Sequence, residues 1–268
     1  MPCHSDPSAR RADSPSSSLS AWRPFLTGVA IGLAFLLLAG VAVGQVPDPR
    51  ALDAMLRANV RNGVVHYAGF QDSTGFRTYV ADLAKPARHS GKSDELAHYI
   101  NAYNALAIAG ILEGLSPSTL LGRARYFKFK EWTLSGRDLT LYDLEHKVIR
   151  PLGDPRIHFA IVCASKSCPF LRGEAYAAPI LDAQLDEQAR QFVNDASRNR
   201  FDKATRTAYL SEIFKWFDED FRAAAGSTQK YVARYVADPE VARAMAADSY
   251  RIEWIDYDWT LNGTLPRQ

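Results

Sequence analysis

The sequence predicts an α+β protein, with a single, mostly helical domain around a small antiparallel sheet. Several segments repeat apolar side chains every three or four residues, as amphipathic helices do. Apolar runs short enough to be strands are few and are scattered among these helices without regular alternation. That pattern argues against a doubly wound parallel sheet. With 268 residues and 47% hydrophobic side chains, the chain is long enough to fill one domain core.

The charge balance excludes one broad class of function. The chain has 32 basic and 30 acidic side chains, which gives a formal net charge of +2. A nucleic-acid-binding domain is expected to have a strong basic excess, so we expect no nucleic-acid partner. Three cysteines are too few for a disulfide-built scaffold. The stability of the protein must therefore come from its hydrophobic core.

Residues 1–47 are expected to lie outside this core. The first 21 residues are rich in Ser, Pro and Arg, and residues 25–43 then form a run without a charged side chain. Such a run is at the lower limit for spanning a bilayer, and the arginines before it indicate a cytoplasmic N-terminus. Two outcomes fit: an export signal cleaved after Gly44, or an N-terminal anchor in the inner membrane. Either outcome places residues 48–268 in the periplasm or outside the cell.

The first half of the domain, from residue 48, is expected to be helical apart from one hairpin. Asp48 is a favourable N-cap, and Pro49 fits the first turn of the helix that follows. The clearest helix has apolar side chains at helical spacing and closes at Gly114. Alternating segments flank a turn at Ser135 and Gly136. In chain order we expect helices over 49–60, 79–83 and 94–112, hairpin segments over 126–129, 132–134 and 138–139, and a helix over 141–149.

The second half is expected to begin with a buried strand. Residues 157–162 are almost wholly apolar and rich in β-branched and aromatic side chains. Ser211 is expected to cap a later helix, and the tail from Tyr257 to Trp259 is expected to be held by aromatic burial. The remaining elements are a helix over 179–196, a strand pair over 201–210, helices over 211–225, 229–236 and 239–246, and a strand over 250–255.

Cys163 is the strongest candidate for chemistry. It directly follows the expected strand and enters a polar turn whose backbone N–H groups could stabilise an oxyanion. A thiol becomes an effective nucleophile where a base or a positive charge lowers its pKa. His146 is the candidate general base, with Glu145, His158 or Asn101 in support. Glu145 and His146 point about 100° apart on their helix, so we do not expect them to contact each other.

The same residues allow other interpretations. Cys163 and Cys168 can form a local disulfide that stabilises the turn by roughly 2 kcal/mol. His158 can be a hydrogen-bonded core residue, and His146 can lie on the surface of its helix. The two histidines and two cysteines together also match the donor types of a zinc site, although their spacings are longer than usual.

Two asparagines interrupt the strongest helix. Asn101 and Asn104 are one turn apart, and asparagine is unfavourable within a helix. One interpretation is that both side chains hold a neighbouring loop by hydrogen bonds. The other is that one of them orients a histidine or binds substrate.

Four motifs in this order resemble the domain-of-unknown-function 547 family. They are residues 100–105 (INAYNA), 144–146 (LEH), 158–165 (HFAIVCAS) with 167–169 (SCP), and 210–217 (LSEIFKWF). The resemblance covers about half of the chain, over residues 96–221. It implies an exported bacterial protein and supplies no activity. Plant relatives keep the first cysteine and have a serine near the second, which implies that Cys163 matters more than a disulfide or a zinc site.

The leading hypothesis is a secreted or periplasmic cysteine-dependent hydrolase or acyltransferase of permuted papain-like character. It would act on an amide or peptide bond of a small-molecule or peptide substrate, and it calls for no cofactor. Residues 25–43 would supply a membrane tether if they are not removed. The alternatives are a non-catalytic envelope binding or scaffold domain with a Cys163–Cys168 disulfide, or a zinc-binding domain. The oligomeric state does not follow from the sequence.

Overall fold

The computed structural model describes residues 44–265. The uncharged run over residues 25–43, predicted to be an export signal or an anchor, lies outside the described residues. Gly44 and Gln45 pair with Ala87 and Arg88 as two short parallel strands, so the described fold includes residues before the expected boundary at residue 48. Within residues 44–265, no helix combines the length and the apolar character needed to cross a membrane.

The first half of the described chain is mostly helical, as predicted, but it has three short strand pairs where one hairpin was expected. Its helices are α1 (Pro49–Asn59), α2 (Tyr67–Gln71), α3 (Thr74–Asp82), α4 (Lys92–Leu112), α5 (Leu120–Ala124), the π-helix η1 (Arg125–Phe129), α6 (Leu141–Asp143) and the π-helix η2 (Leu144–Ile149). Its strands are β1 (Gly44–Gln45), β2 (Val60–Arg61), β3 (Val64–Val65), β4 (Ala87–Arg88), β5 (Glu131–Leu134) and β6 (Arg137–Thr140). The Asp48 side chain accepts a hydrogen bond from the Arg50 N–H, which confirms the predicted cap of α1.

The second half places a small sheet among helices. Its helices are the 3₁₀ turns η3 (Arg150–Leu152), η4 (Pro155–Phe159) and η5 (Ala178–Ile180), and α7 (Leu181–Val193), α8 (Glu212–Trp216), α9 (Asp218–Ala225), α10 (Thr228–Ala233) and α11 (Pro239–Ala246). Its strands are β7 (Arg200–Asp202), β8 (Thr207–Ser211) and β9 (Arg251–Ile255). Ser211 caps α8 as predicted, but the single helix expected over 211–225 is divided at Phe217.

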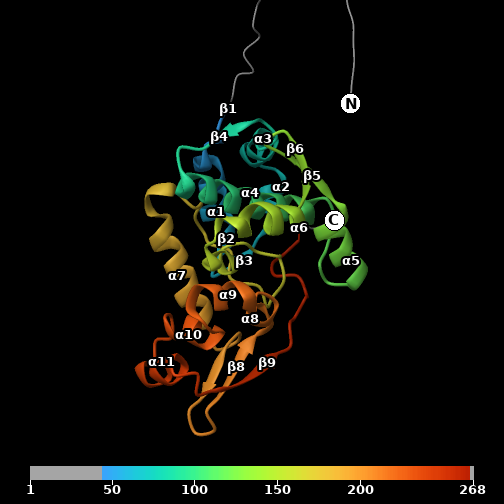
Figure 1. Ribbon diagram of the computed structural model, residues 1–268. Coiled ribbons are helices and arrows are strands. Elements are labelled where there is room, and N and C mark those ends of the chain that lie inside the picture. Colours follow the sequence, from blue (N-terminus) through green and yellow to red (C-terminus); the bar gives the residue numbers. More distant parts are fainter. Residues whose placement is uncertain (1–43, 266–268) are drawn as a thin grey trace, which may run out of the picture. The chain divides into compact units, whose positions relative to one another are not determined.

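The largest sheet has three strands in the order β7-β8-β9. β7 and β8 are antiparallel, as a hairpin must be, whereas β8 and β9 are parallel because four helices connect them. The α+β class is therefore confirmed, with a largest sheet that is mixed rather than purely antiparallel. In Figure 1 this sheet lies in the lower part, and the chain after β9 (red) returns to the upper part beside the first helices.

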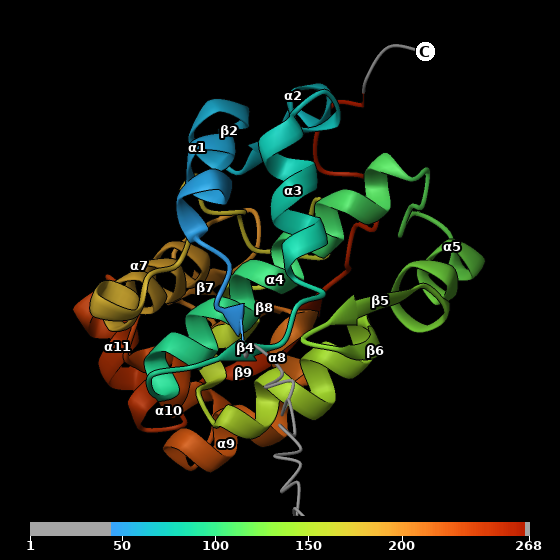
Figure 2. The ribbon, with the colours of Figure 1, turned by 90° about the horizontal axis from the view of Figure 1, so that it is seen from above.

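Two groups of buried side chains form the core. The first surrounds α4, which is buried over most of its length and packs against α1, α2 and α3. Figure 2 shows α4 crossing the middle of the fold. The second group is rich in aromatic side chains and joins Phe159 to α7, α8, α9 and α10; its members include Phe159, Phe192, Phe214, Phe221 and Tyr231. A helix that is apolar on all sides must be covered on all sides, which explains the central place of α4.

The prediction of a buried strand over residues 157–162 is wrong. Pro155 occupies the first turn of η4 and Asp154 caps it, so the apolar run begins as a 3₁₀ helix. Beyond this helix the backbone pairs with a side chain: the Asn104 amide donates to the Ala160 carbonyl and accepts from the Val162 N–H, both at 2.9 Å. A buried backbone needs hydrogen-bond partners, and here an asparagine of α4 supplies what a neighbouring strand would have supplied.

The expected hairpin is confirmed only in part. β5 and β6 pair around Ser135 and Gly136 as predicted. Residues 126–129, however, belong to the π-helix η1. Tyr126 is fully buried there, and its hydroxyl donates a hydrogen bond of 2.9 Å to the Ala107 carbonyl on α4. The apolar residues of this segment therefore reflect burial against α4 and not pairing in a sheet.

Candidate functional site

A cavity of about 190 Å³ is lined by residues from both core groups. Aromatic side chains form a large part of its wall, with a small set of ionisable side chains among the rings. The lining includes Tyr103, Phe127, Tyr142, Trp216, Phe217, Tyr257 and Trp259, together with Lys128, Glu145, His158, Cys163 and Cys168. An apolar pocket with a few convergent polar groups is the usual form of a small-molecule site.

Cys163 lies at a sharp bend on this wall. Its sulfur is 3.0 Å from the Ser165 hydroxyl and 3.1 Å from the Tyr257 hydroxyl. Between Cys163 and Ser165, Ala164 adopts a left-handed conformation with φ of 60°. Such a conformation costs a non-glycine residue roughly 1–2 kcal/mol. The strained turn brings the Ser165 hydroxyl back to the sulfur.

Hydrogen bonding makes the Cys163 thiol unusually acidic. Burial alone would raise its pKa, because an apolar environment disfavours the thiolate. Three hydrogen-bonding side chains outweigh burial and lower the pKa of Cys163 to about 7. In decreasing order of effect they are Cys168, Ser165 and Tyr257. A large fraction of Cys163 is therefore the nucleophilic thiolate at neutral pH.

Cys168 is the second thiol of the site. Its sulfur accepts a hydrogen bond of 2.8 Å from the backbone N–H of Cys163, and both cysteines are free in this structure. Burial, together with the hydrogen bond to Cys163 and the charge on it, raises the pKa of Cys168 well above its usual value. Cys168 is therefore a neutral thiol at neutral pH.

Glu145 faces the same cavity and holds its proton at neutral pH. Its side chain is 13% exposed, and this burial, followed by the charge of Cys163, raises its pKa to about 8. A carboxylic acid that stays protonated at neutral pH can donate a proton in a reaction. Cys163 and Glu145 thus have the acid–base properties of a nucleophile and a proton donor.

His158 lies behind Glu145 and is fixed from two sides. Its ring stacks on Phe217 with centroids 3.8 Å apart, and its Nε2 lies 2.7 Å from a carboxylate oxygen of Asp220. Arg150 binds both oxygens of that carboxylate at 2.8 Å. The hydrogen bond to His158, followed by that to Arg150, holds the pKa of Asp220 well below its usual range. Because Asp220 is a carboxylate, Nε2 must carry the proton that it accepts.

The other nitrogen of His158 is left without a proton. Burial lowers the pKa of His158, so the ring is neutral at pH 7 and its Nδ1 carries a lone pair. This buried Nδ1 has no hydrogen-bond partner among the described residues and lies 3.9 Å from Glu145 Oε1. A small approach of the two groups would let the protonated Glu145 donate to His158.

The structure does not bring His146 to Cys163. The His146 ring stacks on Tyr142 with centroids 4.0 Å apart, and its Nδ1 lies 3.1 Å from the Tyr142 carbonyl oxygen. His146 is absent from the cavity lining, whereas Glu145 and His158 are part of it. His146 directly follows Glu145 on η2, so its side chain points in a different direction and does not reach the cavity wall that Glu145 helps to form.

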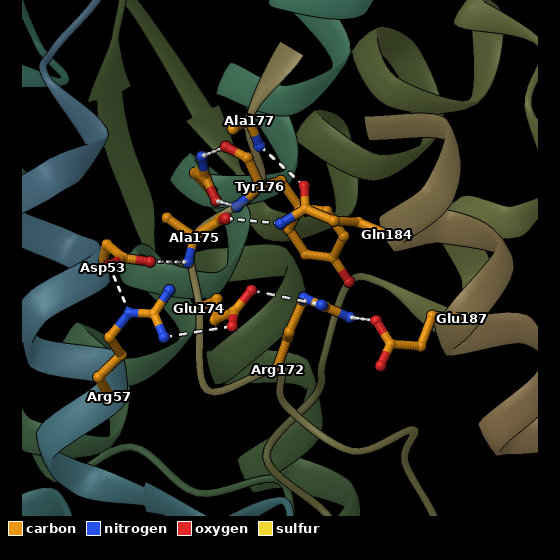
Figure 3. Close-up of polar contacts among 10 residues, drawn as sticks. Asp53, Arg57, Arg172, Glu174, Ala175, Tyr176, Ala177, Gln184 and Glu187 are labelled. Carbon is orange, nitrogen blue, oxygen red and sulfur yellow. Dashed lines mark hydrogen bonds and ion pairs between the residues drawn. The ribbon is translucent and has the colours of Figure 1, made fainter. Parts of the chain in front are cut away.

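Asn101 is engaged with a loop. Its amide donates to the Tyr176 carbonyl and accepts from the Tyr176 N–H, each at 2.8 Å, and it is not part of the cavity lining. Figure 3 shows the same loop held from other sides by Gln184, which binds Ala175 and Ala177. In the same view Arg172 pairs with Glu174 and Glu187, and Asp53 receives the Ala175 N–H.

The zinc-site alternative gains no support from the geometry of the described residues. No group of three His, Cys, Asp or Glu side chains within residues 44–265 converges on a point where it could hold a metal ion. The zinc set would need His146, which faces Tyr142. Cys163 and Cys168 are both free thiols in this structure.

Sequence reasoning missed several residues of the site, including three aromatic side chains and Asp220. Trp216, Tyr257 and Trp259 form an aromatic wall in which the rings of Trp216 and Tyr257 are 4.7 Å apart. From the sequence, aromatic burial is expected for the tail from Tyr257 to Trp259, and Trp216 has no assigned role. Asp220 had no signal, because only the folded chain brings it to His158.

Comparison with known proteins gives one match. The family model described as "Protein of unknown function, DUF547" matches residues 87–193, less than half of the chain. The match includes Glu145, His158, Cys163 and Cys168, whereas Asp220 and the aromatic wall lie beyond it. Neither the curated proteins nor the solved structures contain a match. Residues 87–193 are therefore similar to the DUF547 family.

Proposed function

We propose that this protein is a cysteine-dependent hydrolase or acyltransferase that acts on an amide or peptide bond outside the cytoplasm. Cys163 is the nucleophile, and Glu145 carries the proton in place of the predicted base His146. The observation that supports this most strongly is the sharing of one cavity by a thiol with a pKa of about 7 and a carboxylic acid with a pKa of about 8.

The first half of the reaction uses both groups. The Cys163 thiolate attacks the carbonyl carbon, and the carbonyl oxygen takes the negative charge. When the tetrahedral intermediate collapses, the C–N bond breaks and Glu145 gives its proton to the leaving nitrogen. The amine leaves, and the acyl group stays on Cys163 as a thioester. Glu145 is now a carboxylate.

The second half restores the starting state. The Glu145 carboxylate takes a proton from water, or from the acceptor in a transfer reaction, as that molecule attacks the thioester. The C–S bond breaks and Cys163 returns to the thiolate. His158, fixed by Asp220, acts as a positioning residue that orients the Glu145 carboxyl. Because Glu145 precedes Cys163 in the chain, the order is the one expected of a permuted papain-like site.

Two substrates with the same acyl group test this assignment. A p-nitrophenyl ester has a leaving group that departs without a proton, whereas the corresponding p-nitroanilide needs one. Wild-type protein should be acylated by both. Glu145→Gln should keep the burst from the ester but lose activity on the anilide by about 10²–10⁴-fold. It should also accumulate the thioester, because no base activates water.

Peptide mapping locates the acyl group. Trypsin cleavage after Arg156 and Lys166 releases Cys163 in a peptide of residues 157–166, separate from Cys168. The acyl mass should be on that peptide, and Cys163→Ala should remove both the burst and the label. Glu131→Gln, at an exposed position of β5, is the matched control and should behave as wild type. A burst that persists in Cys163→Ala, or equal losses on ester and anilide in Glu145→Gln, would refute the proposal.

A further inference from the structure

The proposed reaction gives the second thiol of the site, Cys168, no covalent step. Cys168 is 3% exposed, lines the cavity together with Cys163, and its sulfur accepts a hydrogen bond of 2.8 Å from the Cys163 backbone N–H. This contact places the Cys168 thiol against the residue that carries the acidic thiol of the site.

A buried arginine fixes this arrangement. The guanidinium of Arg198 donates to the Cys168 carbonyl and to the Lys166 carbonyl, each at 2.9 Å. It also lies over the Phe170 ring, 4.1 Å from its centroid. The residues on both sides of the Cys168 sulfur are therefore held in place, and Cys168 stays next to Cys163 without a costly search of conformations.

We propose that Cys163 and Cys168 form a redox-active dithiol, in which hydrogen peroxide oxidises Cys163 and Cys168 then closes a reversible disulfide. The Cys163 thiolate attacks one peroxide oxygen, the O–O bond breaks, and hydroxide leaves, so that Cys163 becomes a sulfenic acid. The Cys168 sulfur attacks the sulfenic sulfur, the S–O bond breaks, and water leaves with the Cys168 proton. A small dithiol reductant restores both thiols by exchange.

Oxidation of the first sulfur should activate the second. The pKa of Cys168 is raised by burial, by its hydrogen bond to Cys163 and by the negative charge on Cys163. A sulfenic acid is uncharged at neutral pH. Its formation therefore removes the negative charge on Cys163 that helps to raise the pKa of Cys168. Cys168 then loses its proton more easily at the moment when it must act as the nucleophile.

The disulfide would occupy the nucleophile of the proposed reaction. If the acyl-transfer function is correct, peroxide switches it off and a dithiol switches it on again, while Cys163 is protected from irreversible oxidation to the sulfinic acid. The redox chemistry itself does not depend on that function, because it needs only the two thiols.

Tryptic mapping after exposure to hydrogen peroxide tests the dithiol directly. Cleavage after Lys166 places Cys163 in the peptide of residues 157–166 and Cys168 in the peptide of residues 167–172. In the full-length wild-type chain, peroxide should join the two peptides into one species that dithiothreitol separates. A non-reducing gel should show that the cross-link is within one chain.

Two variants make the result specific. In Cys168→Ser, peroxide should add two or three oxygen atoms to Cys163, and dithiothreitol should not remove them. In Cys163→Ser, Cys168 should remain unoxidised under the same conditions. Wild-type protein in which Cys163 gains oxygen atoms without joining Cys168, or in which Cys163 does not react, would overturn the proposal. These peptide mass measurements need no acyl substrate. A negative result for the redox-active dithiol is therefore distinguishable from a negative result for the proposed hydrolase.

Discussion

Replacing Glu145 with Gln should stabilise the protein at neutral and alkaline pH while it impairs the proposed reaction. Burial raises the pKa of Glu145 from its usual 4.5 to about 8. The folded state therefore binds this proton more tightly than the unfolded chain does. The resulting stabilisation is fully present below pH 4.5 and is lost as the pH rises through 8. Glutamine is neutral at every pH and avoids this loss.

The size of the effect follows from the pKa shift. As the pH rises from the pKa of Glu145 in the unfolded chain to its pKa in the folded protein, each pH unit lowers the unfolding free energy of the wild type by about 1.4 kcal/mol. Relative to Glu145→Gln, the wild type should lose on the order of 3 kcal/mol of unfolding free energy between pH 4 and pH 7. The loss should reach about 5 kcal/mol above pH 8.

Urea unfolding of both proteins at pH 4, 7 and 8.5 measures this difference. The gap in unfolding free energy between the two should grow with pH, while the slope of each transition stays the same. Glu131→Gln is the control for a glutamate at an exposed position. Its unfolding free energy should change with pH in the same way as that of the wild type. A gap between wild type and Glu145→Gln that does not change with pH would show that Glu145 is not held protonated by burial.

Three further predictions concern the groups around Cys163. His146→Ala should change activity by no more than a few-fold in a steady-state assay, because Tyr142 binds the His146 ring away from the cavity; a loss like that of Glu145→Gln would restore His146 as the base. Asn104→Ala should lower the unfolding free energy by about 2–4 kcal/mol in urea, since two buried backbone groups lose their partner; a loss within error would contradict this role. Tyr257→Phe removes a hydrogen bond to the Cys163 sulfur and should raise the pKa of Cys163, seen as a more alkaline midpoint of thiol alkylation; an unchanged midpoint would contradict it.

Elements with local signals were predictable from the sequence. Asp48 and Pro49 mark the start of α1, and the predicted bounds of α11 agree with the structure. A capping side chain acts within three residues of itself, so its effect is already present in a short stretch of sequence. The hairpin of β5 and β6 was predictable for the same reason, because its turn joins adjacent segments.

The course of the chain before Cys163 was not predictable in this way. Residues 157–162 have the composition of a buried strand, but their backbone partner is a side chain 56 to 58 residues away. The sequence signal for this contact is Asn104 itself, because asparagine is unfavourable within a helix such as α4 unless its amide forms hydrogen bonds. Our first interpretation of the two asparagines, that they hold loops, agrees with their contacts; the loops themselves could not be identified from the sequence.

Of the five predicted site residues, only three share one cavity. Cys163, Glu145 and His158 line one cavity, as a site built from them requires. Tyr257 reaches the Cys163 sulfur from 94 residues further along the chain, after β9 returns the chain to the first half of the fold. Asp220 reaches His158 across 62 residues. Neither contact has a spacing that a sequence pattern could reveal.

The pH dependence of Cys163 alkylation tests the central claim most directly. The full-length chain is treated briefly with iodoacetamide from pH 5 to pH 10, and modification is quantified on the tryptic peptide of residues 157–166. The account predicts a midpoint near pH 7, because hydrogen bonds stabilise the thiolate. A midpoint near pH 9, the usual pKa of the thiol, or a sulfur that does not react, would contradict it.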